Sequence, residues 1–163
     1  MLFLITETFF TNRREIKRRL VDFTNEHGID FFCKNRLNGA ARGGAAILVK
    51  KKRGSFKSYT PFVTEFEMVS TVGNMPGYAR KMLLVCSYLP PGMKDSDKCF
   101  EEIIGIINQA KIDFDDPFIA VGGDFNEFGA LPITDAFNEL KETVRPPTQE
   151  DRKMNSSSPN TRR

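Results

Sequence analysis

The chain has 163 residues, of which 40% are hydrophobic and 28% charged, and its formal net charge is +3. This composition excludes a disordered or fibrous protein and predicts one domain with a sizeable core. A mildly basic balance permits an anionic partner without demanding one. The three cysteines are Cys33, Cys86 and Cys99, an odd number without metal-pair spacing, so we expect free thiols in a reducing compartment.

The first elements are a strand and a helix. Leu2–Ile5 reads as a strand, and Asn12–His27 as a helix that Asn12 caps and Gly28 ends. Ile16, Leu20 and Phe23 form its apolar stripe. We expect the only histidine, His27, to cap the end of this helix rather than to act in catalysis.

Strands dominate the middle of the chain. The pattern predicts strands over 29–33, 43–49, 62–72 and 81–88, with a turn at 73–77. The run Lys50–Arg53 reads as a solvated strand end, with contact to DNA as the alternative.

A strand–helix–strand unit follows. A helix from Asp95 or Ser96 to about Ala110 separates the strand that ends at Tyr88 from the apolar run Phe118–Val121. Such a unit brings both strand ends to one side of a sheet, so we expect Tyr88 and Asp124 to lie close together.

The remaining sequence is less regular. Thr134–Leu140 reads as a short helix, and the composition changes after it. We expect the domain to cover residues 1–145, and residues 146–163 to form a disordered tail because they offer little to bury.

The most informative motif is Val-Gly-Gly-Asp-Phe-Asn-Glu, at 121–127. Two glycines allow a sharp turn or a close approach of the backbone to a ligand, and strand tips are where α/β folds place their chemistry. Taken alone, the motif is equally compatible with a β-turn that carries a solvated Asp124.

Together, four segments resemble the endonuclease/exonuclease/phosphatase (DNase I-like) superfamily, and most of all the endonuclease domain of non-LTR retrotransposons. They are, in order, Ile-Thr-Glu-Thr at 5–8, Arg-Gly-Gly-Ala-Ala-Ile-Leu-Val at 42–49, Ser-Tyr-Leu-Pro-Pro at 87–91 and Gly-Gly-Asp-Phe-Asn-Glu at 122–127. The resemblance implies an α/β, DNase I-like sandwich of two packed mixed sheets flanked by helices.

The resemblance also implies a metal-dependent phosphodiesterase with DNA as its ancestral substrate. Glu7 would bind Mg²⁺ or Mn²⁺, Asp124 would orient or deprotonate the attacking water, and Asn126 and Tyr88 would contact the phosphate or that water. Oxygen ligands suit Mg²⁺, and such a metal stabilises charge on a phosphoryl group. On their own motifs, Glu7 also reads as an exposed carboxylate and Tyr88 as an amphipathic strand-end aromatic.

The sequence departs from the family pattern at both ends. The family's first strand, with its asparagine, has no counterpart before Leu2, and the resemblance stops near Met154 without the Ser-Asp-His motif. We therefore expect a truncated, catalytically impaired domain. The alternatives are a non-catalytic remnant that binds nucleic acid or a protein through a sheet edge and, less in keeping with the motifs, a sugar- or inositol-phosphate phosphatase. We expect the protein in the nucleus or the cytoplasm, without a membrane partner, because no apolar run approaches the about 18 residues of a membrane span. The oligomeric state stays open.

Overall fold

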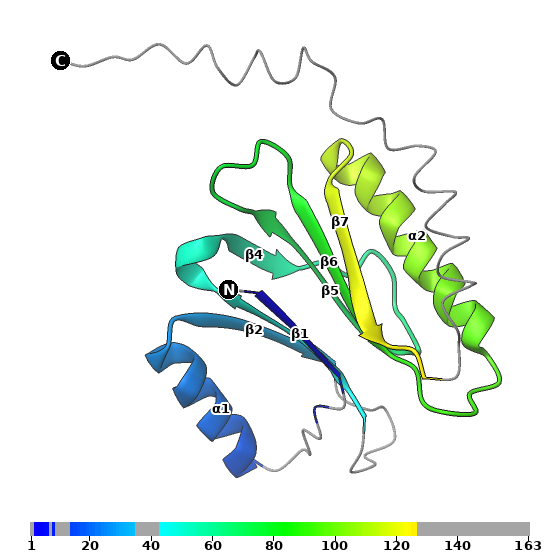
Figure 1. Ribbon diagram of the computed structural model, residues 1–163, viewed down its shortest axis with the longest axis horizontal. Coiled ribbons are helices and arrows are strands. Elements are labelled where there is room, and N and C mark those ends of the chain that lie inside the picture. Colours follow the sequence, from blue (N-terminus) through cyan, green and yellow to red (C-terminus); the bar gives the residue numbers. More distant parts are fainter. Residues whose placement is uncertain (1, 7, 9–13, 35–42, 127–163) are drawn as a thin grey trace. The chain divides into compact units, whose positions relative to one another are not determined.

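A computed structural model describes residues 2–6, 8, 14–34 and 43–126, apart from the side chains of residues 14–17 (Figure 1). All of them belong to one compact unit, Met1–Glu127. The predicted helix at 134–140, the domain boundary at 145 and the tail from 146 lie outside the described residues.

The first sheet has three antiparallel strands in the order β1-β3-β2. The strands are β1 (Leu2–Thr6), β2 (Ile29–Lys34) and β3 (Ala45–Lys50), and all three were predicted from the sequence. Small residues open β3, where Thr6 of β1 and Lys34 of β2 both pair with Ala45. The carboxyl ends of β1 and β2 therefore meet the start of β3.

The second sheet has four strands in the order β4-β5-β6-β7, with β6 and β7 parallel and the other pairs antiparallel. Its strands are β4 (Ser55–Ser58), β5 (Glu67–Asn74), β6 (Met82–Tyr88) and β7 (Phe118–Asp124). The predicted strand at 62–72 was wrong in its limits, because Phe62–Phe66 is not part of a strand and β5 continues through Gly73. A Cβ on Gly73 would lie 2.6 Å from Cγ of Phe56 on β4, so this glycine makes room for a ring instead of starting a turn.

The two sheets pack face to face around an apolar core. Ala45, Ile47 and Val49 of β3 lie against Leu84 and Cys86 of β6. Alternate residues of a strand share a face, so Tyr88 points to the same side as Leu84 and Cys86, towards the first sheet. Residues 83, 85 and 87 point the other way, and Ser87 Oγ lies 3.6 Å from Sγ of Cys99 in the second helix. The predicted two-sheet sandwich is confirmed, with the parallel pair confined to the second sheet among the described strands.

Two helices flank the sandwich, α1 (Arg14–Glu26) beside the first sheet and α2 (Ser96–Phe114) beside the second (Figure 1). Gly28 follows α1 with a φ of 59°, as predicted for the residue after a helix. The predicted apolar stripe of α1 was partly wrong, since Phe23 is 47% exposed and stacks on His27, whereas Thr24 is buried. No helix in the described part of the chain is long and apolar enough to cross a membrane.

Candidate active site

The parallel pairing of β6 with β7 brings together two of the predicted site residues. Tyr88 and Asp124 are direct partners in the register, each at the carboxyl end of its strand. The ladder continues one step further, where the N–H of Leu89 donates to the carbonyl oxygen of Asp124 at 2.8 Å. The strand–helix–strand prediction is thus confirmed, and one main-chain hydrogen bond fixes the spacing of the two strand ends.

Gly122 and Gly123 belong to β7 and form no turn. A Cβ on Gly123 would lie 1.9 Å from the carbonyl oxygen of Ser87, and one on Gly122 would lie 2.6 Å from Cδ1 of Leu4. Gly123 therefore permits close pairing with β6 within the sheet, and Gly122 leaves room for Leu4 of β1. The alternative of a Gly-Gly β-turn was wrong, because β7 continues to Asp124.

The turn comes after Asp124 and is built by side chains. Asp124 Oδ1 accepts the N–H of Asn126 at 3.0 Å, and Asn126 adopts a left-handed φ of 47° that asparagine tolerates better than most residues. The Nδ2 of Asn126 donates to the carbonyl oxygen of Leu89 at 2.7 Å. Leu89 therefore holds both Asp124 and Asn126 through its main chain.

The three residues differ in their exposure to solvent. Tyr88 is 5% exposed, Asp124 is half-buried and Asn126 is exposed. A carboxylate and an amide that reach solvent therefore lie beside a buried phenol at this end of the sheet. The carboxylate can accept hydrogen bonds, and the amide can both donate and accept them.

Glu7 and Glu127 lie outside the described residues, but a neighbour of Glu7 is placed. Thr8 Oγ1 donates to the carbonyl oxygen of Gly43 at 3.4 Å, just before β3. The described chain on either side of Glu7 is thus tied to β3, through the pairing of Thr6 with Ala45 and through this bond.

Glu67 is a further acidic residue here that the sequence reasoning did not select. It is 8% exposed, pairs with Tyr88 in the register and accepts the N–H of Gly44 through Oε2 at 2.5 Å. Glu67, Tyr88 and Asp124 therefore form one row across β5, β6 and β7 on the face towards the first sheet. The sequence offered only a weak signal for Glu67, an acidic residue within the strand predicted over 62–72, and no motif marks it.

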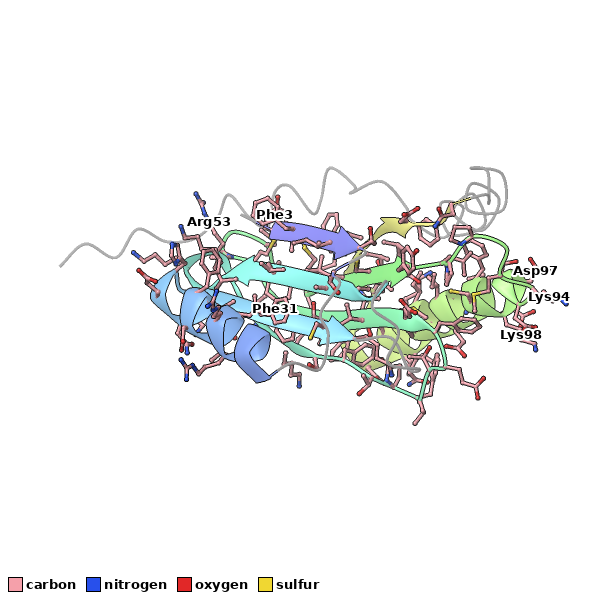
Figure 2. The ribbon with its side chains drawn as sticks, turned by 90° about the horizontal axis from the view of Figure 1, so that it is seen from below. Phe3, Phe31, Arg53, Lys94, Asp97 and Lys98 are labelled. Atoms are coloured by element: carbon pink, nitrogen blue, oxygen red, sulfur yellow. The ribbon has the colours of Figure 1, made fainter. Side chains whose placement is uncertain are left out.

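Two other groups singled out from the sequence lie elsewhere. His27 Nδ1 donates to the carbonyl oxygen of Phe23 at 3.0 Å, so its predicted role at the end of α1 is confirmed. The Lys50–Arg53 run forms the end of β3 and a 3₁₀ turn (Lys51–Arg53), where Lys51 pairs with Asp30 at 3.8 Å. In Figure 2, Arg53 lies at the opposite end of the unit from Lys94 and Lys98, which are near the start of α2 and follow the Tyr88 strand end.

Solved structures share this arrangement of sheets and helices. Humanized D. rerio TDP2 matches with a TM-score of 0.52 and 16% identity, over 82% of this chain and 52% of that one. ANGEL2, a 2′,3′-cyclic phosphatase, matches with a TM-score of 0.55 and 17% identity, over 85% of this chain and 43% of that one. The chain has the DNase I-like fold. This is the fold of the endonuclease/exonuclease/phosphatase superfamily that the motifs predicted.

A further solved structure is similar to this chain with a lower score. The endonuclease domain of TRAS1, a telomere-specific non-LTR retrotransposon, matches with a TM-score of 0.47 and 15% identity, over 69% of this chain and 52% of that one. This score is too low to carry the retroelement assignment. No family model matches the sequence, and no curated protein matches it. The chain spans about half the length or less of the solved structures named here.

The donors at this end of the DNase I-like sandwich suit a hard cation. No group of three or more His, Cys, Asp or Glu side chains that could hold a metal ion occurs among residues 2–6, 8, 14–34 and 43–126. Mg²⁺ needs no such cage, since proteins hold it through one or two carboxylates while water and phosphate oxygens complete its shell. Among the described residues, the half-buried Asp124 carboxylate is one oxygen ligand that fits this pattern.

Proposed function

We propose that this chain is a metal-dependent phosphodiesterase domain that acts on nucleic acid, of the DNA endonuclease type. The observation that carries the proposal is the register of Tyr88 with Asp124, with Asn126 fastened to Leu89 beside them. A phenol, a carboxylate and an amide at one strand-end edge are the groups that hydrolysis of a phosphodiester needs around the phosphate.

Each residue has a distinct role in this proposal. Asp124 orients the attacking water and accepts its proton, because its second oxygen remains for a ligand while Oδ1 holds the turn. Asn126 and Tyr88 hydrogen-bond the phosphate without adding charge that would repel it. Glu7 would hold Mg²⁺ or Mn²⁺, as the family resemblance implies. The bound metal supplies charge stabilisation at the phosphoryl and leaving oxygens.

The proposed source of the domain is a retroelement. The support is the pair of motifs Ser-Tyr-Leu-Pro-Pro at 87–91 and Gly-Gly-Asp-Phe-Asn-Glu at 122–127, which resemble retroelement endonucleases more than sugar-phosphate phosphatases. The neighbouring genomic reading frames test this. A first-strand asparagine upstream and a Ser-Asp-His motif downstream would support it, and unrelated frames on both sides would count against it.

Nicking of supercoiled plasmid tests the activity. We expect the chain to nick weakly, because its one histidine, His27, lies at the end of α1 and a positioned acid–base group is worth about 10² to 10⁴ in rate. That weak activity should need Mg²⁺ or Mn²⁺, stop with EDTA and disappear in Asp124→Ala. The control Asp22→Ala removes an exposed carboxylate from α1 and should leave nicking unchanged. Nicking that persists in Asp124→Ala would overturn the proposed role of Asp124.

A second candidate is a binding domain without catalysis. Among the described strands β1 pairs only with β3, and it exposes Leu2, Phe3 and Ile5; Phe3 is 43% exposed (Figure 2). An exposed apolar edge strand is a surface on which another chain can pair. Salt-sensitive DNA binding without metal-dependent nicking, in a folded protein, would favour this candidate over the enzyme.

A further inference from the structure

Glu67 is a buried acid that the proposed catalytic roles leave without a task. It opens β5 at 8% exposure, in the row that continues through Tyr88 to Asp124. Burying a carboxylate is costly unless hydrogen bonds compensate it, and well-packed apolar residues often stabilise a core better than buried charges do. A carboxylate at this position therefore calls for a reason beyond packing.

The first contact of Glu67 is with a double-glycine turn. Its Oε2 accepts the N–H of Gly44 at 2.5 Å. A Cβ on Gly43 would lie 2.4 Å from the same oxygen, so the carboxylate lies directly against the main chain of Gly43. Gly43 and Gly44 have φ values of 104° and 92°, a conformation that side chains disfavour. The turn and the carboxylate thus fit one another, and only glycine satisfies both conditions at residue 43.

The second contact leads from this turn to the end of β1. The carbonyl oxygen of Gly43 accepts the hydroxyl of Thr8 at 3.4 Å, and a Cβ on Gly44 would lie 2.6 Å from Thr8 Oγ1. Thr8 directly follows Glu7 in the sequence. A path of two hydrogen bonds therefore joins Glu67, in the second sheet, to Thr8, which follows β1 and directly follows the proposed metal ligand in the sequence.

We propose that Glu67 is a positioning residue, whose carboxylate anchors the Gly43–Gly44 turn and, through Thr8, holds the chain that follows β1. Glu7, the proposed metal ligand, directly precedes Thr8 in the sequence. The catalytic consequence of this anchor rests on the phosphodiesterase function proposed above. A hydrogen bond to a charged acceptor is stronger than one between neutral groups, which suits a contact that holds this turn. Glu67 itself touches neither the phosphate nor the water in this proposal.

Three variants of the full chain test the anchor. Glu67→Ala removes the acceptor, whereas Glu67→Gln keeps an oxygen that can accept the N–H of Gly44. Glu65→Gln is the matched control, because it removes a charge from an exposed residue two positions away. The first measurement is amide hydrogen exchange at Gly44 by NMR, without metal. We expect faster exchange in Glu67→Ala, a smaller change in Glu67→Gln and none in the control.

The second measurement is Mn²⁺ binding, detected through the electron paramagnetic resonance signal of the metal. The metal dependence of nicking is measured with it. Loss of a residue that orients a metal ligand typically weakens metal affinity or activity about 10- to 100-fold. We expect a loss in this range for Glu67→Ala and a recovery to within a few-fold of wild type for Glu67→Gln. A purely structural role would lower stability without changing the metal affinity of the folded fraction.

The outcomes separate the two proposals. Unchanged exchange at Gly44 in a folded Glu67→Ala protein would overturn the anchor. A second result would also overturn the anchor. If metal affinity is as low in Glu67→Gln as in Glu67→Ala while Gly44 stays protected in Glu67→Gln, then the charge of Glu67, and not its hydrogen bond, determines metal affinity. Absence of both Mn²⁺ binding and nicking in the wild type would overturn the proposed function, and the exchange data would still decide whether Glu67 holds the turn. If Glu67→Ala does not fold, Glu67→Gln alone carries the comparison with the control.

Discussion

The side-chain amide of Asn126 donates to the carbonyl oxygen of Leu89 at 2.7 Å, and so fastens the turn after β7 to the end of β6. Because Leu89 also donates its N–H to the carbonyl of Asp124, one residue outside the motif of residues 121–127 holds two members of it. The candidate site is therefore held by the main chain of a neighbouring strand end as well as by its own turn.

Replacing Asn126 should separate the hydrogen bond from the backbone conformation. Both Asn126→Gly and Asn126→Ala remove the bond to Leu89, but only alanine resists the left-handed φ of 47°. We expect Asn126→Ala to lower the free energy of unfolding by about 1 kcal/mol more than Asn126→Gly does. Urea denaturation of the two variants measures the difference, and equal stabilities would contradict it.

The two glycines of β7 should differ sharply in their tolerance of alanine. The atom that a Cβ on Gly123 would meet is a main-chain oxygen, that of Ser87, whereas the atom facing Gly122 is the end of the Leu4 side chain. The main chain of Ser87 cannot move away, because β6 pairs with a strand on each side, but a leucine methyl can rotate. We expect Gly123→Ala to cost about 3 kcal/mol or more and Gly122→Ala to cost less than that. Thermal unfolding of both proteins gives the order, and a reversed order would contradict the strand geometry.

Tyr59 should make the protein lose stability at alkaline pH. Burial raises the pKa of the Tyr59 phenol well above its usual range, and its hydrogen bond to Asp113 Oδ2 at 2.8 Å adds to this. Above about pH 10 the unfolded chain gives up the phenol proton while the folded chain keeps it, so the free energy of unfolding falls as the pH rises. Below that pH the contribution is fully present.

Denaturation at pH 9 and at pH 11 tests this sign. The fall in stability between the two values should be larger in wild type than in Tyr59→Phe, which has no proton to lose. At pH 7 the same variant should be less stable than wild type by about 1 kcal/mol, the usual net value of a hydrogen bond. An equal fall in both proteins would show that other groups cause the alkaline loss.

The three cysteines should react with a thiol reagent in two classes. Cys33 is exposed on β2, whereas Cys86 and Cys99 are buried, and burial raises the pKa of both of these thiols, that of Cys86 to about 11. The thiolate is the reacting form, so at pH 8 we expect one fast equivalent in the folded protein and three in denaturant. The variant Cys33→Ser should lose the fast equivalent. A fast equivalent that remains in that variant would contradict the burial of Cys86 and Cys99.

The sequence predicted the parts of the fold that rest on local patterns. The register of Tyr88 with Asp124 follows from two apolar runs joined by an amphipathic helix, which leave little choice of topology. The helix end at His27 follows from the glycine after it. The fold itself rested on the motifs and their order along the chain.

Long-range contacts explain what the sequence did not predict. From the sequence alone, Gly73 and Gly123 both resemble turn residues. The structure gives the reason for each glycine, since Phe56 lies over Gly73 and Ser87 lies beside Gly123. The short strand β4 has few apolar residues, so no local pattern predicts it. It is a strand because it pairs with β5. Glu67 belongs to the same class, since its hydrogen bond to the N–H of Gly44 joins residues 23 positions apart in the sequence.

The row Glu67–Tyr88–Asp124 also fixes the order in which the site is completed. Its members come from three strands, and the last of them, β7, is the final strand described along the chain. Because synthesis proceeds from the amino terminus, a ribosome-bound chain that has not yet released β7 contains Glu67 and Tyr88 but not Asp124. The row is therefore completed only when β7 docks beside β6.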